Sequence, residues 1–167
     1  AIRDILSNYK KYCYQNDANA AQKIIVASNY SGMAINISQT TAAHAMSYKL
    51  TSLYGIPHGH AVAVGLPHIW RYIKENTDKC TDKRGSEYLR GALERIAKSF
   101  EKIGSDEIAV FENLLNELEI SAPQISADDV EILTKSVNIE RLKNTPVYTD
   151  ETVIKELYAR IAGSEKK

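Results

Sequence analysis

The sequence predicts an all-α fold, a helical bundle of seven to nine helices in one domain. Through most of the 167 residues, apolar side chains recur at three- and four-residue steps, which is the spacing of one helix face. Outside those patterns, no segment alternates apolar and polar side chains over four or more residues, as a half-buried strand would. The eight glycines form neither a GxGxxG nor a Walker motif, so we expect no nucleotide-binding sheet and no cofactor-binding residue in this chain.

The first part of the chain shows three helix patterns in succession. Residues 1–14 carry one apolar stripe and predict an amphipathic helix. Residues 18–37, capped by Asp17, are apolar nearly all round, so we expect this helix to be buried at the centre and to pack against the next one. Residues 39–54 predict that next helix, which stops at Gly55.

A tight turn follows at residues 55–59, where two glycines and a proline restrict the backbone. A fourth apolar helix is expected over residues 60–76. Pro67 lies inside it and removes one helical donor, so it should bend the helix or start a new one.

The second half predicts more helices, separated by polar breaks. They are expected at residues 87–103, 106–118, 127–137 and 151–161, with one helical turn within 138–148 and a frayed tail at 164–167. Gly104 is the expected C-cap of the first of these helices, and Ser105 the N-cap of the second. Ser126 opens a capping box, and Thr149 or Asp150 caps the last helix.

Composition excludes several classes of partner. Lysine plus arginine and aspartate plus glutamate number 21 each, so nothing in the charge balance favours nucleic acid or an anionic membrane. No apolar run approaches the roughly 18 residues of a membrane span, and the N-terminus lacks the layout of a signal peptide. We therefore expect a cytoplasmic protein.

All four histidines lie within residues 39–73. From His44 the helix climbs roughly 15 Å to Tyr54, and the four links from Tyr54 to His58 can return about 13 Å when extended. If the turn folds back along the helix, the two imidazoles can share one divalent iron, zinc or nickel ion. The alternative is that His44 is a core histidine and His58 a turn residue.

The run from His44 to Gly59, HAMSYKLTSLYGIPHG, followed by Ala61 and Leu66-Pro67-His68, resembles the signature of the iron-containing (group III) alcohol dehydrogenases. The resemblance implies that His44 and His58 are ligands of Fe2+, with Zn2+ or another divalent ion as an alternative. In that family the other two ligands are an Asp and a His four residues later, on an upstream helix. This chain contains no Asp-x-x-x-His. It would therefore supply only half of the family's metal site.

The resemblance also implies the architecture. Residues 1–167 would be a single helical metal and substrate domain, similar to the C-terminal domain of dehydroquinate synthase, within a longer two-domain enzyme. A missing N-terminal nucleotide-binding domain would hold NAD(P), and the enzyme would transfer a hydride between NAD(P)H and a small aldehyde or alcohol. The fragment alone would be inactive, and a homodimer is compatible with the family.

Some residues depart from the family pattern. Tyr48 stands where many members have a histidine one turn after the first ligand, and as a hydrogen-bond donor it is a candidate catalytic residue. His60 and Lys49 are candidate substrate contacts, and Arg71 is a further cation, although each is also explained as a surface residue. Residues 40–62 resemble members that reduce phosphonoacetaldehyde, whose anionic group would explain these side chains.

Two other functions fit the sequence. One is a metal- and NAD-dependent lyase similar to dehydroquinate synthase, although the Tyr-Gly-Ile-Pro-His-Gly turn argues against it. The other is a self-contained helical binding or scaffold domain whose histidines are structural.

Overall fold

The computed structural model describes residues 1–163, and over that range the chain forms nine α-helices and one short 3-10 helix. The helices are α1 (Ile2–Gln15), α2 (Ala18–Ser38), α3 (Ala42–Tyr54), α4 (His58–Glu75), α5 (Gly85–Ala97), α6 (Glu107–Glu117), α7 (Ala127–Ser136), α8 (Ile139–Leu142) and α9 (Glu151–Ile161), with the 3-10 turn at Thr77–Lys79. Extended pairing within residues 1–163 is limited to one isolated bridge between Cys80 and Val147. The all-α prediction is confirmed, while the predicted frayed tail lies outside the described residues.

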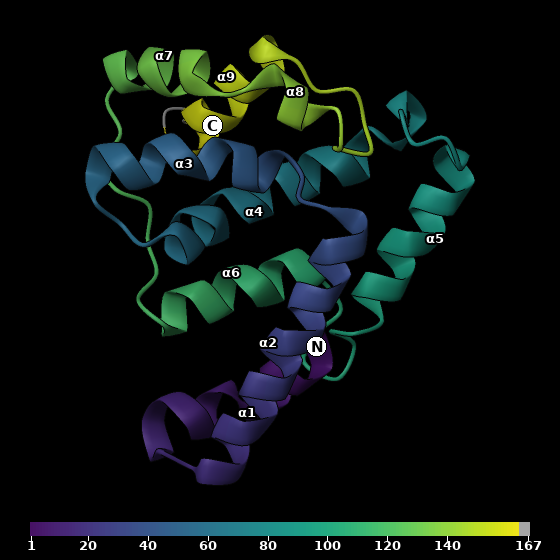
Figure 1. Ribbon diagram of the computed structural model, residues 1–167, viewed down its shortest axis with the longest axis vertical. Helices are drawn as coiled ribbons and strands as arrows, with labels where there is room; N and C mark the ends of the chain where they lie inside the picture. Colours follow the sequence, from purple (N-terminus) through teal and green to yellow (C-terminus); the bar gives the residue numbers. More distant parts are fainter. Residues whose placement is uncertain (164–167) are drawn as a thin grey trace.

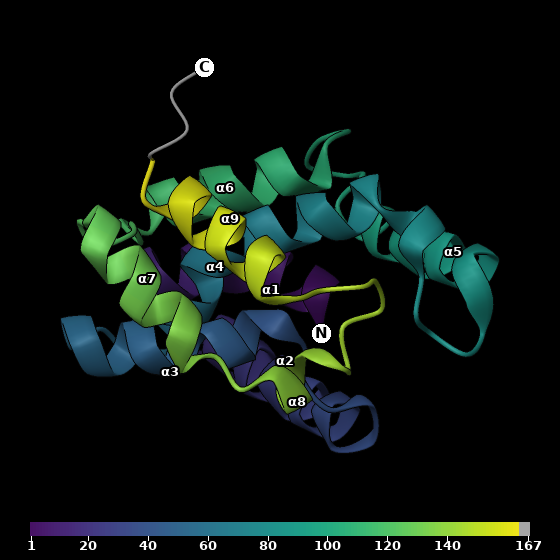
Figure 2. The ribbon, with the colours of Figure 1, turned by 90° about the horizontal axis from the view of Figure 1, so that it is seen from above.

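Helices α3 and α4 form the centre of the molecule (Figure 1). They pack against each other, α7 and α9 cover one side of the pair, and α6 lies along α4 on the other side. Seen from above, α9 lies over α4 while α7 and α8 lie along α3 (Figure 2). The helix pair that carries all four histidines is therefore the one that the rest of the bundle is built around.

The main core lies where α9 meets α3 and α4. Tyr158 of α9 has no exposed surface, and its hydroxyl donates a 2.7 Å hydrogen bond to the backbone carbonyl of Met46 in α3. Leu50 of α3 and Leu157 of α9 belong to the same apolar cluster. Burial raises the pKa of the Tyr158 phenol well above its usual range, so it is a neutral donor at all physiological pH values.

The prediction that residues 18–37 form a buried central helix is wrong. The principal neighbour of α2 is α1, and the two form a hairpin that projects from one end of the molecule (Figure 1). One neighbouring helix can cover only one face, so large apolar side chains remain exposed on α2. The most exposed are Ile25 (68%), Tyr30 (55%), Met33 (58%) and Ile37 (89%).

Two helix ends after residue 85 also differ from the prediction. Helix α5 stops at Ala97, and residues 98–103 continue as tight turns in which Phe100 is buried against the ring of Trp70, 5.6 Å away. Gly104 is therefore no helix cap, although a Cβ there would lie 2.8 Å from a methyl of Val110, so the position has no room for a side chain. Asp106, and not Ser105, caps α6 by accepting from two backbone N–H groups.

Several local signals are confirmed. Ser126 and Asp129 form the predicted capping box of α7, Asp150 caps α9, and α8 is the single helical turn expected within residues 138–148. Pro67 starts no new helix, because α4 continues through it from His58 to Glu75. None of the helices in residues 1–163 is long and apolar enough to cross a membrane.

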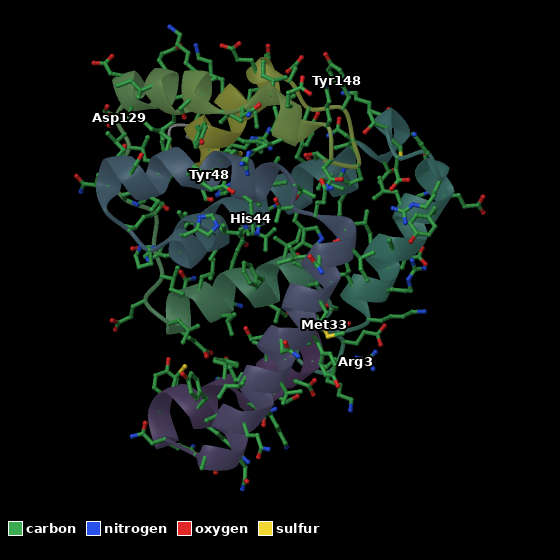
Figure 3. All side chains as sticks on the ribbon, in the orientation of Figure 1. Arg3, Met33, His44, Tyr48, Asp129 and Tyr148 are labelled. Atoms are coloured by element: carbon green, nitrogen blue, oxygen red, sulfur yellow. The ribbon has the colours of Figure 1, made fainter. Side chains whose placement is uncertain are left out.

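The Tyr158 hydrogen bond gives a stability prediction. Tyr158→Phe removes the hydroxyl but keeps the ring, so we expect the free energy of unfolding to fall by about 1 kcal/mol. That corresponds to a decrease in Tm of about 2–4 °C for a chain of this size. Thermal unfolding followed by circular dichroism measures it. Tyr148→Phe, at an exposed ring (Figure 3), is the control and should leave Tm unchanged; equal shifts for both variants would contradict the assignment.

Candidate metal centre

The turn between α3 and α4 places the two candidate ligands. Gly55 has φ +68° and caps α3 by donating its N–H to the Thr51 carbonyl, a conformation that glycine adopts without strain. Pro57, at φ −56°, immediately precedes α4. Because α4 begins at His58 and not at residue 60 as predicted, His58 lies at the point where the chain turns back along α3.

His44 and His58 lie side by side. Nδ1 of His44 is 3.2 Å from Nε2 of His58, and the two ring centroids are 5.2 Å apart at an interplanar angle of 46°. Figure 3 labels His44 and, one turn later on α3, Tyr48. Fourteen residues apart in sequence, the imidazoles therefore point one nitrogen each at a common position.

Ser47 contacts both histidines of the pair. Its side chain has no exposed surface, and its hydroxyl donates a 2.9 Å hydrogen bond to the carbonyl of His44. The same oxygen lies 3.1 Å from Nδ1 of His58. If the carbonyl takes the single hydrogen of the hydroxyl, neutral His58 carries its proton on Nδ1 and donates to Ser47. Nε2 of His58 is then an unprotonated nitrogen that faces His44.

The spacing of the two nitrogens fits one metal ion. Zinc–imidazole bonds are about 2.0–2.1 Å long, so two such nitrogens on a tetrahedral ion lie about 3.3 Å apart. Here the separation is 3.2 Å. Burial, and secondarily the charge of His58, lowers the pKa of His44, which favours the neutral form that a metal requires.

The pair supplies only part of a coordination shell. Within residues 1–163, no group of three or more histidine, cysteine, aspartate or glutamate side chains is placed to hold a metal ion. The two imidazoles fit two positions on an ion.

Tyr48 and Arg141 lie next to the pair. The Tyr48 ring is 5.4 Å from that of His58, centroid to centroid. Nη1 of Arg141, in α8, donates a 2.7 Å hydrogen bond to the Tyr48 hydroxyl, and the guanidinium carbon lies 4.8 Å from the centroid of the same ring. The Tyr48 oxygen accepts from Arg141, so its own proton remains available to donate.

The other predicted site residues are not part of this group. Nε2 of His60 lies 2.7 Å from the carbonyl oxygen of Ser121, in the link between α6 and α7. Lys49 is five positions after His44, so its side chain leaves α3 about 140° around the helix from the imidazole. Arg71 is paired with Glu112 of α6 at 3.2 Å. Substrate contacts by His60 and Lys49 stay predictions.

Sequence reasoning did not identify Ser47 and Arg141. A signal for Ser47 was present, because a small polar residue three positions after a candidate ligand lies on the same helix face. Arg141 is 93 residues from Tyr48, and no local pattern connects them.

An apolar cavity of 530 Å³ lies away from the histidines. Trp70, Leu93 and Phe100 are among its lining residues, and neither His44 nor His58 contributes to it. The histidine pair instead lies at the surface, with His58 exposed and His44 partly exposed. Chemistry at the pair would therefore need a covering surface from elsewhere.

Comparison of sequences relates the chain to known oxidoreductases. The family model described as the Fe-containing alcohol dehydrogenase family, C-terminal, matches residues 1–162. The chain is 39% identical over 82 residues to phosphonoacetaldehyde reductase of Streptomyces viridochromogenes, covering 48% of this chain and 21% of the reductase. It is 38% identical over 84 residues to 1,3-propanediol dehydrogenase of Citrobacter freundii, covering 49% of this chain and 22% of that enzyme.

Comparison of structures agrees. An iron-containing alcohol dehydrogenase from Thermotoga maritima superposes with a TM-score of 0.75 at 26% identity, covering 97% of this chain and 40% of that structure. A second iron-containing alcohol dehydrogenase gives a TM-score of 0.74 at 27% identity and the same 40% coverage. The chain thus spans less than half the length of its solved relatives. It belongs to the iron-containing alcohol dehydrogenase family and corresponds to that family's C-terminal helical domain.

Proposed function

We propose that this chain is the metal- and substrate-binding domain of an NAD(P)-dependent alcohol dehydrogenase or aldehyde reductase. His44 and His58 are two ligands of its divalent metal, Fe2+ by family and Zn2+ as the alternative. The observation that carries the proposal is the 3.2 Å approach of Nδ1 of His44 to Nε2 of His58. The same 3.2 Å separation is also that of a hydrogen bond between two structural imidazoles, and metal titration distinguishes the two arrangements.

The residues around the pair have separate tasks. When bound, the metal supplies a Lewis acid that polarises the carbonyl oxygen of the substrate. Ser47 accepts the Nδ1 proton of His58 and so keeps Nε2 free and oriented. Tyr48 can donate its phenolic proton to a substrate oxygen, as a positioned hydrogen-bond donor.

The rest of the enzyme would lie outside this chain. We assign residues 1–167 to one helical domain of a longer two-domain protein whose N-terminal part holds NAD(P) and supplies an aspartate and a histidine to the metal. Two observations support this: the chain covers 40% of the solved relatives, and α2 carries an apolar face that its own neighbours leave exposed. The small-molecule substrate would bind between the two domains.

Metal binding by the 167-residue chain tests the ligand assignment. Co2+ added to the wild-type chain should give the visible absorption of an imidazole-bound ion. His44→Ala and His58→Ala should each weaken its binding about 10-fold or more, because each leaves a single imidazole. Titration of the absorbance with Co2+ gives the affinities.

His60→Ala is the matched control for these variants. It removes a histidine two positions from His58 whose Nε2 faces Ser121, so Co2+ affinity should be unchanged. If the His44 and His58 variants bind Co2+ as tightly as the wild type, the two histidines are not ligands.

The tautomer argument gives a prediction for Ser47. Ser47→Ala removes the acceptor of the His58 Nδ1 proton, and we expect Co2+ affinity to fall about 10-fold, as for other groups that orient a ligand. Nitrogen-15 NMR of His58 should also show loss of the single Nδ1–H tautomer. Ser52→Ala is the control, since Ser52 likewise bonds the carbonyl three residues back in α3 but lies on its exposed surface. Unchanged affinity and tautomer in Ser47→Ala would refute the positioning role.

The two-domain assignment is tested on the coding DNA. Upstream of the codon for Ala1 we expect an open reading frame for roughly one more domain, with a glycine-rich loop after a strand. An Asp-x-x-x-His should follow on a helix near the junction. An initiation codon directly before Ala1 would leave a free-standing helical protein and contradict the hydride-transfer function.

A further inference from the structure

Arg141 is held in place beside the histidine pair by a well-anchored element. The next residue, Leu142, is buried in the main core at 4% exposure, and α8 contacts α3. Three residues later, the buried hydroxyl of Thr145 accepts a 3.1 Å hydrogen bond from the backbone N–H of Ala42, at the start of α3. The segment that carries Arg141 is therefore attached to the helix that carries His44.

The guanidinium has no carboxylate partner among the described residues. The nearest acid in sequence, Glu140, accepts from Lys143 at 2.8 and 2.6 Å. Within residues 1–163, no carboxylate lies within ion-pair distance of Arg141. Its partner is the side chain of Tyr48, which binds it by one hydrogen bond and by its ring face. The guanidinium is therefore held by Tyr48 without a carboxylate partner among residues 1–163.

Arg141 is exposed to solvent, so an anion can reach its guanidinium. The pair His44 and His58 is neutral when it binds a divalent cation, so an arginine nearby adds to a positive field. Nη1 is used by Tyr48, while Nη2 and Nε still offer donors in the planar arrangement that suits phosphonate and carboxylate groups.

We infer that Arg141, held by Tyr48, is a specificity-determining residue that binds an anionic group of the substrate next to the His44–His58 pair. The preferred substrates are then small aldehydes or alcohols that carry a phosphonate or carboxylate a few bonds from the reacting carbon. This inference rests on the proposed function. It assigns the subsite to Arg141, whereas Arg71 is already paired with Glu112.

The geometry suits a short substrate. The Tyr48 ring is close to both groups: its centroid lies 4.8 Å from the guanidinium carbon of Arg141 and 5.4 Å from the ring centroid of His58. A molecule whose oxygen lies at the histidine pair and whose anionic end lies at Arg141 would therefore be short and would pass close to Tyr48.

Binding of matched ligands to the 167-residue chain tests the inference. The probes are 2-hydroxyethylphosphonate, 3-hydroxypropanoate, neutral 1,3-propanediol and inorganic phosphate, each titrated calorimetrically at one fixed Zn2+ concentration. Arg141→Gln should weaken the binding of 2-hydroxyethylphosphonate about 10-fold or more, because a charge-assisted bidentate contact is lost. It should weaken the binding of 3-hydroxypropanoate to a smaller extent. The affinity for 1,3-propanediol should not change. Complexation of free Zn2+ by a probe is the same for every variant and cancels in the comparison.

Two further variants serve as controls. Lys143→Gln removes a nearby exposed cation that is paired with Glu140, and it should leave every affinity unchanged. Arg141→Lys keeps the charge but not the planar donors, and it should recover only part of the affinity. Equal loss in Lys143→Gln and Arg141→Gln would mean a general charge effect and overturn the proposal.

Other outcomes would also overturn it. The subsite is excluded if the wild type and Arg141→Gln have the same affinity for the anions. It is also excluded if neither protein binds them measurably. Inorganic phosphate binding as tightly as 2-hydroxyethylphosphonate would indicate an unspecific anion site. Failure of the proposed function is seen separately, as unchanged Co2+ affinity in His44→Ala and His58→Ala.

Discussion

The reversal of the chain at Gly55 is the constraint on which the rest of this structure depends. A left-handed residue ends α3, and two residues later a proline precedes α4, so the two helices must pack against each other. That packing makes the central pair on which α6, α7 and α9 lie (Figure 1). It also brings His58 back to His44, so the same turn determines both the core and the candidate metal centre.

The C-terminal third of the chain adds contacts that fix the position of α3. Tyr158 ties α9 to the backbone of α3 at Met46, and Thr145 ties the segment after α8 to the start of α3. These contacts bury polar groups that are fully bonded, which favours one arrangement over slipped alternatives. The consequence for function is that Arg141 is delivered to Tyr48 across 93 residues, beside the histidines.

Two features of the domain lack partners among the described residues: the candidate metal centre and the apolar face of α2. The candidate metal centre has two imidazoles and no third ligand within the described residues, and α2 exposes Ile25, Met33 and Ile37. An apolar face of this kind is unfavourable in water and marks a contact surface. Both features, with the 40% coverage of the solved relatives, are the basis of our proposal that this domain works against another part of a longer protein.

The sequence by itself determined the fold class, most helix bounds and the Ser126 cap, because each depends on neighbours within a few turns of the chain. It narrowed the cap of α9 to Thr149 or Asp150, and it showed that His44 and His58 could meet if the turn folded back along the helix. It was wrong about α2, since an apolar helix is buried only if other elements cover it, and periodicity cannot show which elements do. It was also wrong about the end of α5, because the helix stops at Ala97 and Phe100, in the turns that follow, packs against Trp70. Only the tertiary structure decided that Ser47 contacts His58 and that Arg141 lies on Tyr48, because the position of each partner depends on how separate helices pack.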